Sequence, residues 1–199
     1  MKIEVILFDL GGVLVELTGV PTMLSWSRLT EAEVWQRWLH SPAVRRFESG
    51  NGSAEEFARE IIDELTLNTT TDEFLTQFTA WPRGVFSGGI ELLQELGRNH
   101  QVACLSNTNH LHWDRFEQET ELLDHFHAAF ASHQTGHLKP DASSFEHAID
   151  ALGVVAENIL FMDDNQINID AAQAAGLVAK LTRGVDQATE HVRSYRLLD

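Results

Sequence analysis

The sequence predicts an α/β fold built on a doubly wound, mostly parallel β-sheet. Short, continuously apolar runs of the kind that form buried parallel strands recur along the chain, and the strongest of them end in clusters of polar residues. Helical segments with one apolar face alternate with these runs. Alternating strands and helices favour a parallel sheet with right-handed crossovers and helices on both faces.

The strands are predicted where apolar residues run without interruption. The first covers Val5 to Phe8 and is followed by Asp9 and two glycines. Two further strong strands and two weaker ones are predicted over Gln101–Leu105, Asn158–Met162, Ala128–Ser132 and Leu177–Leu181. Helices are predicted over Gly89–Arg98, Ala142–Leu152 and Asn168–Ala175, the last of them capped by Gly176. Open α/β sheets bind ligands at the carboxyl ends of their strands, so the polar residues there are the first candidates for an active site.

Residues 17–83 differ from the rest of the chain because they contain amphipathic helical patterns but no convincing buried strand. Two such helices cover Glu31–Leu39 and Ala54–Leu65, and the second opens with the capping-box pattern of Ser53 and Glu56. Four of the five tryptophans lie in this stretch, where we expect most of them to form the core of a small bundle. We therefore predict a core domain of residues 1–16 and 84–199 and a helical cap of residues 17–83.

Composition excludes several classes of partner. Thirty acidic and 14 basic residues give a formal net charge of −16, which argues against nucleic acid and against anionic membrane surfaces. The only cysteine, Cys104, lies in an apolar run and is expected to be a buried, inert residue. The N-terminal segment fits neither a signal peptide nor a membrane-spanning helix, so we expect a cytoplasmic protein.

Three of the polar clusters suit chemistry on a phosphate group. Asp9, at the end of a buried strand and before glycines that allow close approach of a ligand, suits nucleophilic attack on phosphorus. Ser106 and Asn107 follow the second strong strand and can bind phosphate oxygens together with backbone N–H groups. Lys139, before Pro140, can place a positive charge beside the phosphate.

The third strong strand ends at Asp163, Asp164 and Asn165, with Asn168 close behind. Oxygen ligands of this kind are those that Mg²⁺ prefers. Two unpaired carboxylates after a buried strand are costly, so a bound cation is the simpler explanation. The ion would also reduce repulsion between an anionic nucleophile and an anionic substrate.

Taken together and in this order, the four segments resemble the motifs of the haloacid dehalogenase (HAD) superfamily: Phe8–Leu14, Leu105–Asn109, His137–Asp141 and Phe161–Ala172. The resemblance covers nearly the whole chain and implies a Rossmann-like core with a helical cap of the C1 type. Within the superfamily, the chain most resembles α-D-glucose-1-phosphate phosphatase-like proteins. This resemblance implies a magnesium-dependent phosphatase that acts on a small phosphorylated metabolite, such as a glycosyl 1-phosphate.

The resemblance also implies a role for each motif residue. Asp9 would be the nucleophile and a magnesium ligand, and Gly11 would offer its carbonyl to the metal. Ser106 and Asn107 would bind phosphate, with Gly11 beside them. Lys139 would stabilise both the nucleophile and the phosphate. Asp164 would be the carboxylate on magnesium, in preference to Asp163.

One departure from the family pattern concerns the general acid. Most phosphatases of the superfamily carry a second aspartate two residues after the nucleophile, where this chain has Gly11. Its loss predicts slower turnover or a preference for good leaving groups. A loop histidine, one of His110, His112, His133 and His137, is a candidate replacement. Arg45 and Arg46 are candidates for contact with the leaving group.

Two alternatives remain at this point. The first is a dehalogenase of the same superfamily, in which Asp9 attacks carbon without a second aspartate. The paired aspartates 163 and 164 argue against it, because that reaction needs no metal. The second is a weakly active, phosphate-binding regulatory protein.

Overall fold

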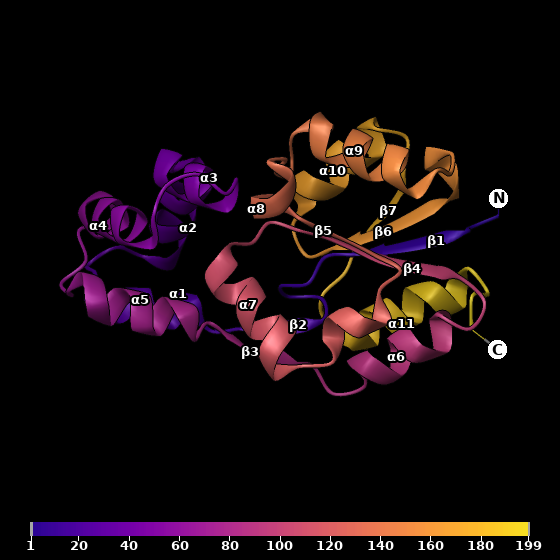
Figure 1. Cartoon of the computed structure of the whole chain (residues 1–199), viewed down its shortest axis with the longest axis horizontal. Coiled ribbons are helices and arrows are strands. Elements are labelled where there is room, and N and C mark those ends of the chain that lie inside the picture. The colour runs from indigo at the N-terminus through magenta and orange to yellow at the C-terminus, as the bar shows by residue number, and fades with distance from the viewer. Residues whose placement is uncertain (1, 199) are drawn as a thin grey trace.

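A computed structural model describes residues 2–198, which form a five-stranded sheet with helices on both faces. A second group of helices lies beyond the carboxyl ends of the strands (Figure 1). The strands are β1 (Val5–Phe8), β4 (Gln101–Ser106), β5 (Ala128–Ala131), β6 (Ile159–Asp163) and β7 (Val178–Leu181). They lie in the order β5-β4-β1-β6-β7, and all neighbours are parallel. The predicted doubly wound α/β fold is therefore confirmed.

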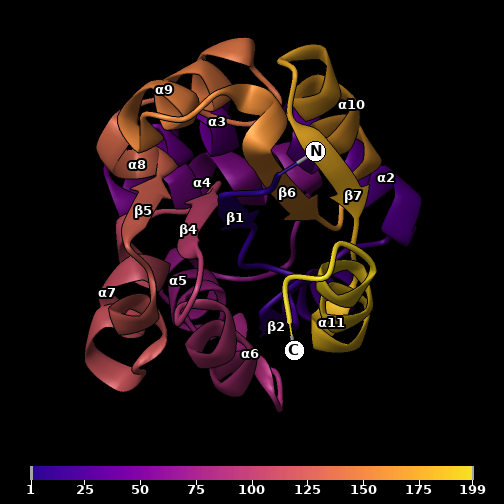
Figure 2. The same cartoon turned by 90° about the vertical axis from the view of Figure 1, so that its right-hand side faces the viewer.

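The central strand is apolar throughout because both of its faces are covered. Ile6 and Phe8 pack into one apolar cluster, whereas Val5 and Leu7 pack into another. The first cluster includes helices α6 (Gly89–Leu96), α7 (His110–Glu119) and α11 (Gly184–Ser194). The second includes α9 (Ala142–Leu152) and α10 (Gln166–Ala174), on the opposite face of the sheet (Figure 2). Short helical turns complete the core: α8 (Ser132–Thr135), η1 (Leu122–His125) and η2 (Ala156–Asn158).

Five helices lie apart from the sheet and pack on one another (Figure 1): α1 (Gly19–Trp26), α2 (Glu31–His40), α3 (Pro42–Glu48), α4 (Ala54–Leu65) and α5 (Thr71–Thr79). Their shared core is aromatic, with Trp38, Phe57 and Phe78 in mutual contact. The capping box of Ser53 and Glu56 opens α4, as the sequence predicts. Trp35 is the exception to the expected burial, since 40% of its surface is exposed.

A two-stranded antiparallel ribbon connects this helical group to the core. It pairs β2 (Val15–Leu17) with β3 (Pro82–Val85) and was not among the predicted strands. The predicted limits of the cap, residues 17 and 83, fall within this ribbon, and we propose that the two parts of the chain divide there. Within residues 2–198, no helix is long and apolar enough to cross a membrane.

Candidate active site

Asp9 directly follows β1, the central strand, and is 9% exposed. Its Oδ1 accepts hydrogen bonds from the Leu10 N–H (2.7 Å) and from Lys139 Nζ (2.9 Å). Its Oδ2 has no hydrogen-bond partner among residues 2–198, so one oxygen is held while the other is available to a ligand. Burial raises the pKa of Asp9 to about 8, and the negative charges of Asp163 and Asp164 add to this effect against the opposing charge of Lys139.

Lys139 is almost fully buried, and its ammonium group lies between two carboxylates. Nζ is 2.9 Å from Asp9 Oδ1 and 2.6 Å from Asp163 Oδ2. Burial alone would lower the pKa of Lys139, but these two ion pairs outweigh it and raise the pKa above its usual value. The lysine therefore remains charged beside the predicted nucleophile.

The Asn107 side chain holds the main chain of Lys139. Its Nδ2 donates to the Lys139 carbonyl (2.8 Å), and its Oδ1 accepts from the Lys139 N–H (2.9 Å). Both polar atoms of the predicted phosphate-binding amide are thus engaged within the protein. The main chain of Asn107 and the second N–H of its Nδ2 are left for a bound phosphate, and this coupling of two motifs across 32 residues is not visible in the sequence.

Asp163 is fully buried and surrounded by donors. Its Oδ1 accepts from the Asn165 N–H (2.8 Å), its Oδ2 accepts from Lys139 Nζ, and Asn168 Nδ2 lies 3.0 Å from each oxygen. The amide nitrogen of Asn168 thus points at Asp163, so the Asn168 side chain serves to hold the Asp163 carboxylate. Asp163 is hydrogen-bonded directly to Lys139, so it is better placed to orient this lysine than to bind a metal ion.

Asp164 follows β6 and lies against the turn after Asp9. A Cβ atom on Gly12 would be 2.3 Å from Asp164 Oδ2, and Gly12 has a φ of +71°. Only glycine meets both demands without strain. Burial, followed by the charge of Asp163, raises the pKa of Asp164. Apart from its own main-chain N–H, no group within the described part of the chain donates a hydrogen bond to this carboxylate, which leaves it available for a cation.

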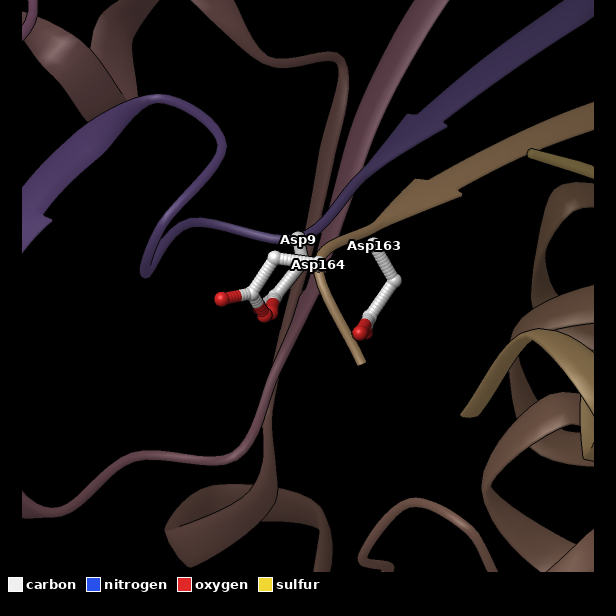
Figure 3. Close-up of side chains that lie close together, drawn as sticks. All are labelled: Asp9, Asp163 and Asp164. Atoms are coloured by element: carbon white, nitrogen blue, oxygen red, sulfur yellow. The ribbon is translucent and has the colours of Figure 1, made fainter. Parts of the chain in front are cut away.

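The donor set fits a hard divalent cation. One oxygen from each of Asp9, Asp163 and Asp164 can be chosen so that all three lie within 4.8 Å of one another, at the adjoining ends of β1 and β6 (Figure 3). Burial first, and then the negative charge of the neighbouring aspartates, raises the pKa values of Asp9 and Asp164, and a bound cation would favour the ionised form of both. Because Asp163 is already saturated with donors, Asp9 and Asp164 are the better ligands.

A cavity of about 540 Å³ opens beside these groups, between the sheet edge and the five-helix group. Its core side is lined by residues at or just after the carboxyl ends of β1, β4 and β6: Leu10, Gly11, Gly12, Ser106, Asn107 and Asp164. Its other side is largely aromatic, with contributions from Trp35, Trp38, Phe78 and Trp81. The hydroxyl of Ser106 has no hydrogen-bond partner among residues 2–198 and is free to meet a ligand.

A family model of haloacid dehalogenase-like hydrolases matches residues 3–176. The chain belongs to this family. The match spans all four motif segments and agrees with the strand order and the clustered aspartates described above. The predicted superfamily is thereby confirmed, whereas the likeness to glucose-1-phosphate phosphatases stays a prediction.

Individual relatives of this HAD-like hydrolase cover most of its length. It is 29% identical over 187 residues to a D-ribitol-5-phosphate phosphatase of Bacteroides thetaiotaomicron, covering 87% of this chain and 89% of that protein. A HAD-like family hydrolase of Porphyromonas gingivalis superimposes with a TM-score of 0.78 at 25% identity, over 98% and 99% of the two chains. A HAD family enzyme of B. thetaiotaomicron, crystallised with magnesium and inorganic phosphate, gives a TM-score of 0.73 at 22% identity over 90% and 93%.

Of the four histidines predicted as candidate acids, only His112 lines the cavity in the described part of the chain, and it, like the two predicted arginines, is engaged elsewhere. His112 lines the cavity, but its Nε2 lies 2.7 Å from the Phe78 carbonyl and its Nδ1 lies 3.2 Å from Asn109 Nδ2. Burial lowers the pKa of His112 to about 4, so the ring is neutral. Arg45 and Arg46 are not among the cavity-lining residues, and they form ion pairs with Asp141 and Glu60.

Sequence reasoning missed Glu48, which lines the cavity from the end of α3. Glu48 is far along the sequence from all four motifs, so none of them points to it. The one sequence signal is the segment Phe47-Glu48-Ser49-Gly50, in which a carboxylate ends a helix just before a glycine. This carboxyl group lines the cavity, within range of the charges of Lys139 and Asp9, because α3 packs on α8 of the core.

Proposed function

We propose that this HAD-like hydrolase is a magnesium-dependent phosphatase that hydrolyses a small phosphomonoester through an aspartyl-phosphate on Asp9. The observation that carries the proposal is the buried Asp9–Lys139–Asp163 array, in which one oxygen of Asp9 is held and the other is free. The phosphatase relative and the neighbouring structure with magnesium and phosphate support the same reaction class.

Each residue has a task in this reaction. Oδ2 of Asp9 attacks phosphorus, while Leu10 and Lys139 hold Oδ1 and orient the carboxylate. The free hydroxyl of Ser106 and the positive charge of Lys139 stabilise negative charge on the phosphoryl oxygens. Asp163 and Asn107 keep Lys139 in place through its ammonium group and its main chain. When bound by Asp9 and Asp164, magnesium would neutralise charge on the phosphate and keep Asp9 ionised.

The substrate is the finer part of the proposal. The sequence resemblance predicts a sugar phosphate such as a glycosyl 1-phosphate, and the name of one relative specifies D-ribitol 5-phosphate. Aromatic rings such as Trp35 and Trp38 can stack on the apolar face of a sugar, and the cavity volume of about 540 Å³ suits a small metabolite. We therefore place sugar and polyol phosphates first among the candidates.

The test is phosphate release from a panel of sugar phosphates, polyol phosphates and p-nitrophenyl phosphate, with magnesium or with excess chelator. Asp9→Asn is the inactive variant, and Asp170→Asn, an exposed aspartate on α10, is the matched control. We expect release that needs both magnesium and Asp9 and is unchanged in the control. Release that persists in Asp9→Asn would refute the mechanism, and halide release from 2-haloacids without phosphate release would establish the dehalogenase instead.

A further inference from the structure

The helical cap contributes one carboxyl group, that of Glu48, to the wall of the cavity, where the charges of Lys139 and Asp9 act on it. We propose that Glu48 is the proton donor to the leaving-group oxygen and, in the second half of the reaction, the base that takes a proton from the attacking water. This inference rests on the proposed phosphatase function. It assigns to the cap the task for which Gly11 provides no side chain.

The main chain at Glu48 is fixed to the core beside the phosphate-binding segment. Ser132 Oγ donates to the Glu48 carbonyl (2.6 Å) and accepts from the Thr108 N–H (2.9 Å). Two residues on, Gly50 has a φ of +81°, and a Cβ atom there would be 2.2 Å from the carbonyl oxygen of His133. This close approach places the end of α3 against α8, and Ser132 of α8 links it to Thr108 in the loop that follows β4.

The Glu48 side chain is held in the cavity without a partner. It lines the same cavity as Ser106 and Asp164, and no hydrogen bond or ion pair joins its carboxyl group to any residue in the range 2–198, the proposed metal ligands included. Burial raises its pKa to about 8; the positive charge of Lys139 opposes this effect and the negative charge of Asp9 adds to it. Near neutral pH the group therefore carries a proton, as an acid catalyst must.

Other ionisable groups in the cavity wall are unsuited to the task. His112 is neutral, and both of its ring nitrogens are engaged. Asp164 belongs to the proposed metal site, and Glu16 is exposed on the β2 strand. Glu48 is the remaining ionisable group on the cavity wall of the described chain, and it lies on the cap side, where a leaving group would sit once the phosphate is bound at Ser106.

Glu48 gives up one proton in the first step of the reaction and regains one in the second. In the first, Asp9 Oδ2 forms a bond to phosphorus, the bond from phosphorus to the leaving oxygen breaks, and the proton of Glu48 passes to that oxygen to give the free alcohol. In the second, the Glu48 carboxylate accepts a proton from water as the water oxygen bonds to phosphorus and the bond to Asp9 breaks. Inorganic phosphate leaves, and both carboxyl groups return to their starting states.

The experiment compares leaving groups in Glu48→Gln. Glutamine matches the neutral glutamic acid in shape and charge but cannot transfer a proton, so folding should be preserved; Glu48→Asp, which keeps an acid, is the second variant. Glu55→Gln, the same change at an exposed position of α4, is the control. We measure kcat/KM, which reports the first irreversible step, on the best sugar or alkyl phosphate of the panel and on 2,4-dinitrophenyl phosphate, whose leaving group needs no proton.

For Glu48→Gln we expect kcat/KM on the alkyl substrate to fall by about 10² to 10⁴-fold and on the activated aryl substrate by less than about 3-fold. Because the second step also loses its base, the aryl substrate should show a burst of phenol release followed by slow turnover. Glu48→Asp should retain part of the alkyl activity, and Glu55→Gln should match the wild type.

Equal losses of kcat/KM on the two substrates would assign Glu48 a structural or binding role and overturn the inference. So would an alkyl activity that is unchanged, or a rise in KM alone. If the wild type releases no phosphate from any substrate beyond the Asp9→Asn background, the proposed phosphatase function fails and this inference fails with it.

Discussion

The replacement Asp163→Asn tests whether the first aspartate of the pair supports Lys139 or binds the metal. All groups within hydrogen-bond distance of its two oxygens are donors: the Asn165 N–H, Asn168 Nδ2 and Lys139 Nζ. An asparagine must turn its NH₂ group toward at least one of them. The variant therefore loses a buried charge and also places a donor against a donor.

The magnitude follows from burial. Removing one partner of a buried ion pair costs about 3 to 5 kcal/mol, and the lower end applies here because Lys139 keeps Asp9 at 2.9 Å. We expect about 3 kcal/mol of destabilisation, or a fall in Tm of about 6 to 12 °C in a chain of this size. Asp164→Asn should cost less than about 1 kcal/mol, since its carboxylate has no such partners and it is repelled by Asp163.

The assay is chemical unfolding in excess chelator, so that differences in magnesium affinity do not enter the free energy of unfolding, together with a magnesium titration of activity. We expect Asp164→Asn to weaken the apparent magnesium affinity by at least about 100-fold, and Asp163→Asn to weaken it less, as an outer-shell change does. Asp170→Asn, on the exposed face of α10, should leave both quantities near the wild type.

Two results would refute this reasoning. One is a loss of stability below about 1 kcal/mol in Asp163→Asn, which would mean that the donors around it find other partners. The other is a magnesium affinity that falls as far in Asp163→Asn as in Asp164→Asn, which would make Asp163 a metal ligand of equal standing.

Asn107→Ala removes both hydrogen bonds that hold the Lys139 main chain, so kcat should fall by about 10-fold or more with a loss of about 1 to 3 kcal/mol in unfolding; an unchanged kcat would contradict the coupling. Gly12→Ala should be less stable than Gly184→Ala and need more magnesium, because both have a φ of +71° but only the Cβ at position 12 meets Asp164; equal effects would argue against this contact. In chelator, the predicted nucleophile has a pKa raised to about 8, so the folded state keeps a proton that the unfolded state loses above about pH 4. As the pH rises from about 4 to about 8, Asp9 alone lowers the free energy of unfolding by up to about 1.4 kcal/mol per pH unit. Because magnesium holds the carboxylate ionised, it should stabilise the protein more at pH 8 than at pH 5. An equal gain at the two pH values in urea unfolding would refute the assignment.

The parts of the fold that the sequence predicts well are those where local pattern and burial agree. The helices over Ala54–Leu65 and Ala142–Leu152 have the predicted limits, and each of the five sheet strands lies within a residue or two of its prediction. The β2–β3 ribbon was missed because Pro82-Arg83-Gly84 carries no strand pattern. Its pairing with Val15–Leu17 arises where the chain leaves the core and returns to it, which is a tertiary relationship.

By itself, the sequence determined that this is an α/β HAD-like protein and that its polar clusters meet at one sheet edge, because parallel strands carry their carboxyl ends to the same side. Tertiary structure decided what each polar side chain does there. It turned Asn107 onto the Lys139 main chain, saturated Asp163 with donors, and brought Glu48 into the cavity. Such roles depend on side-chain direction and on how the cap packs against the core, and neither is encoded in residue spacing along the chain.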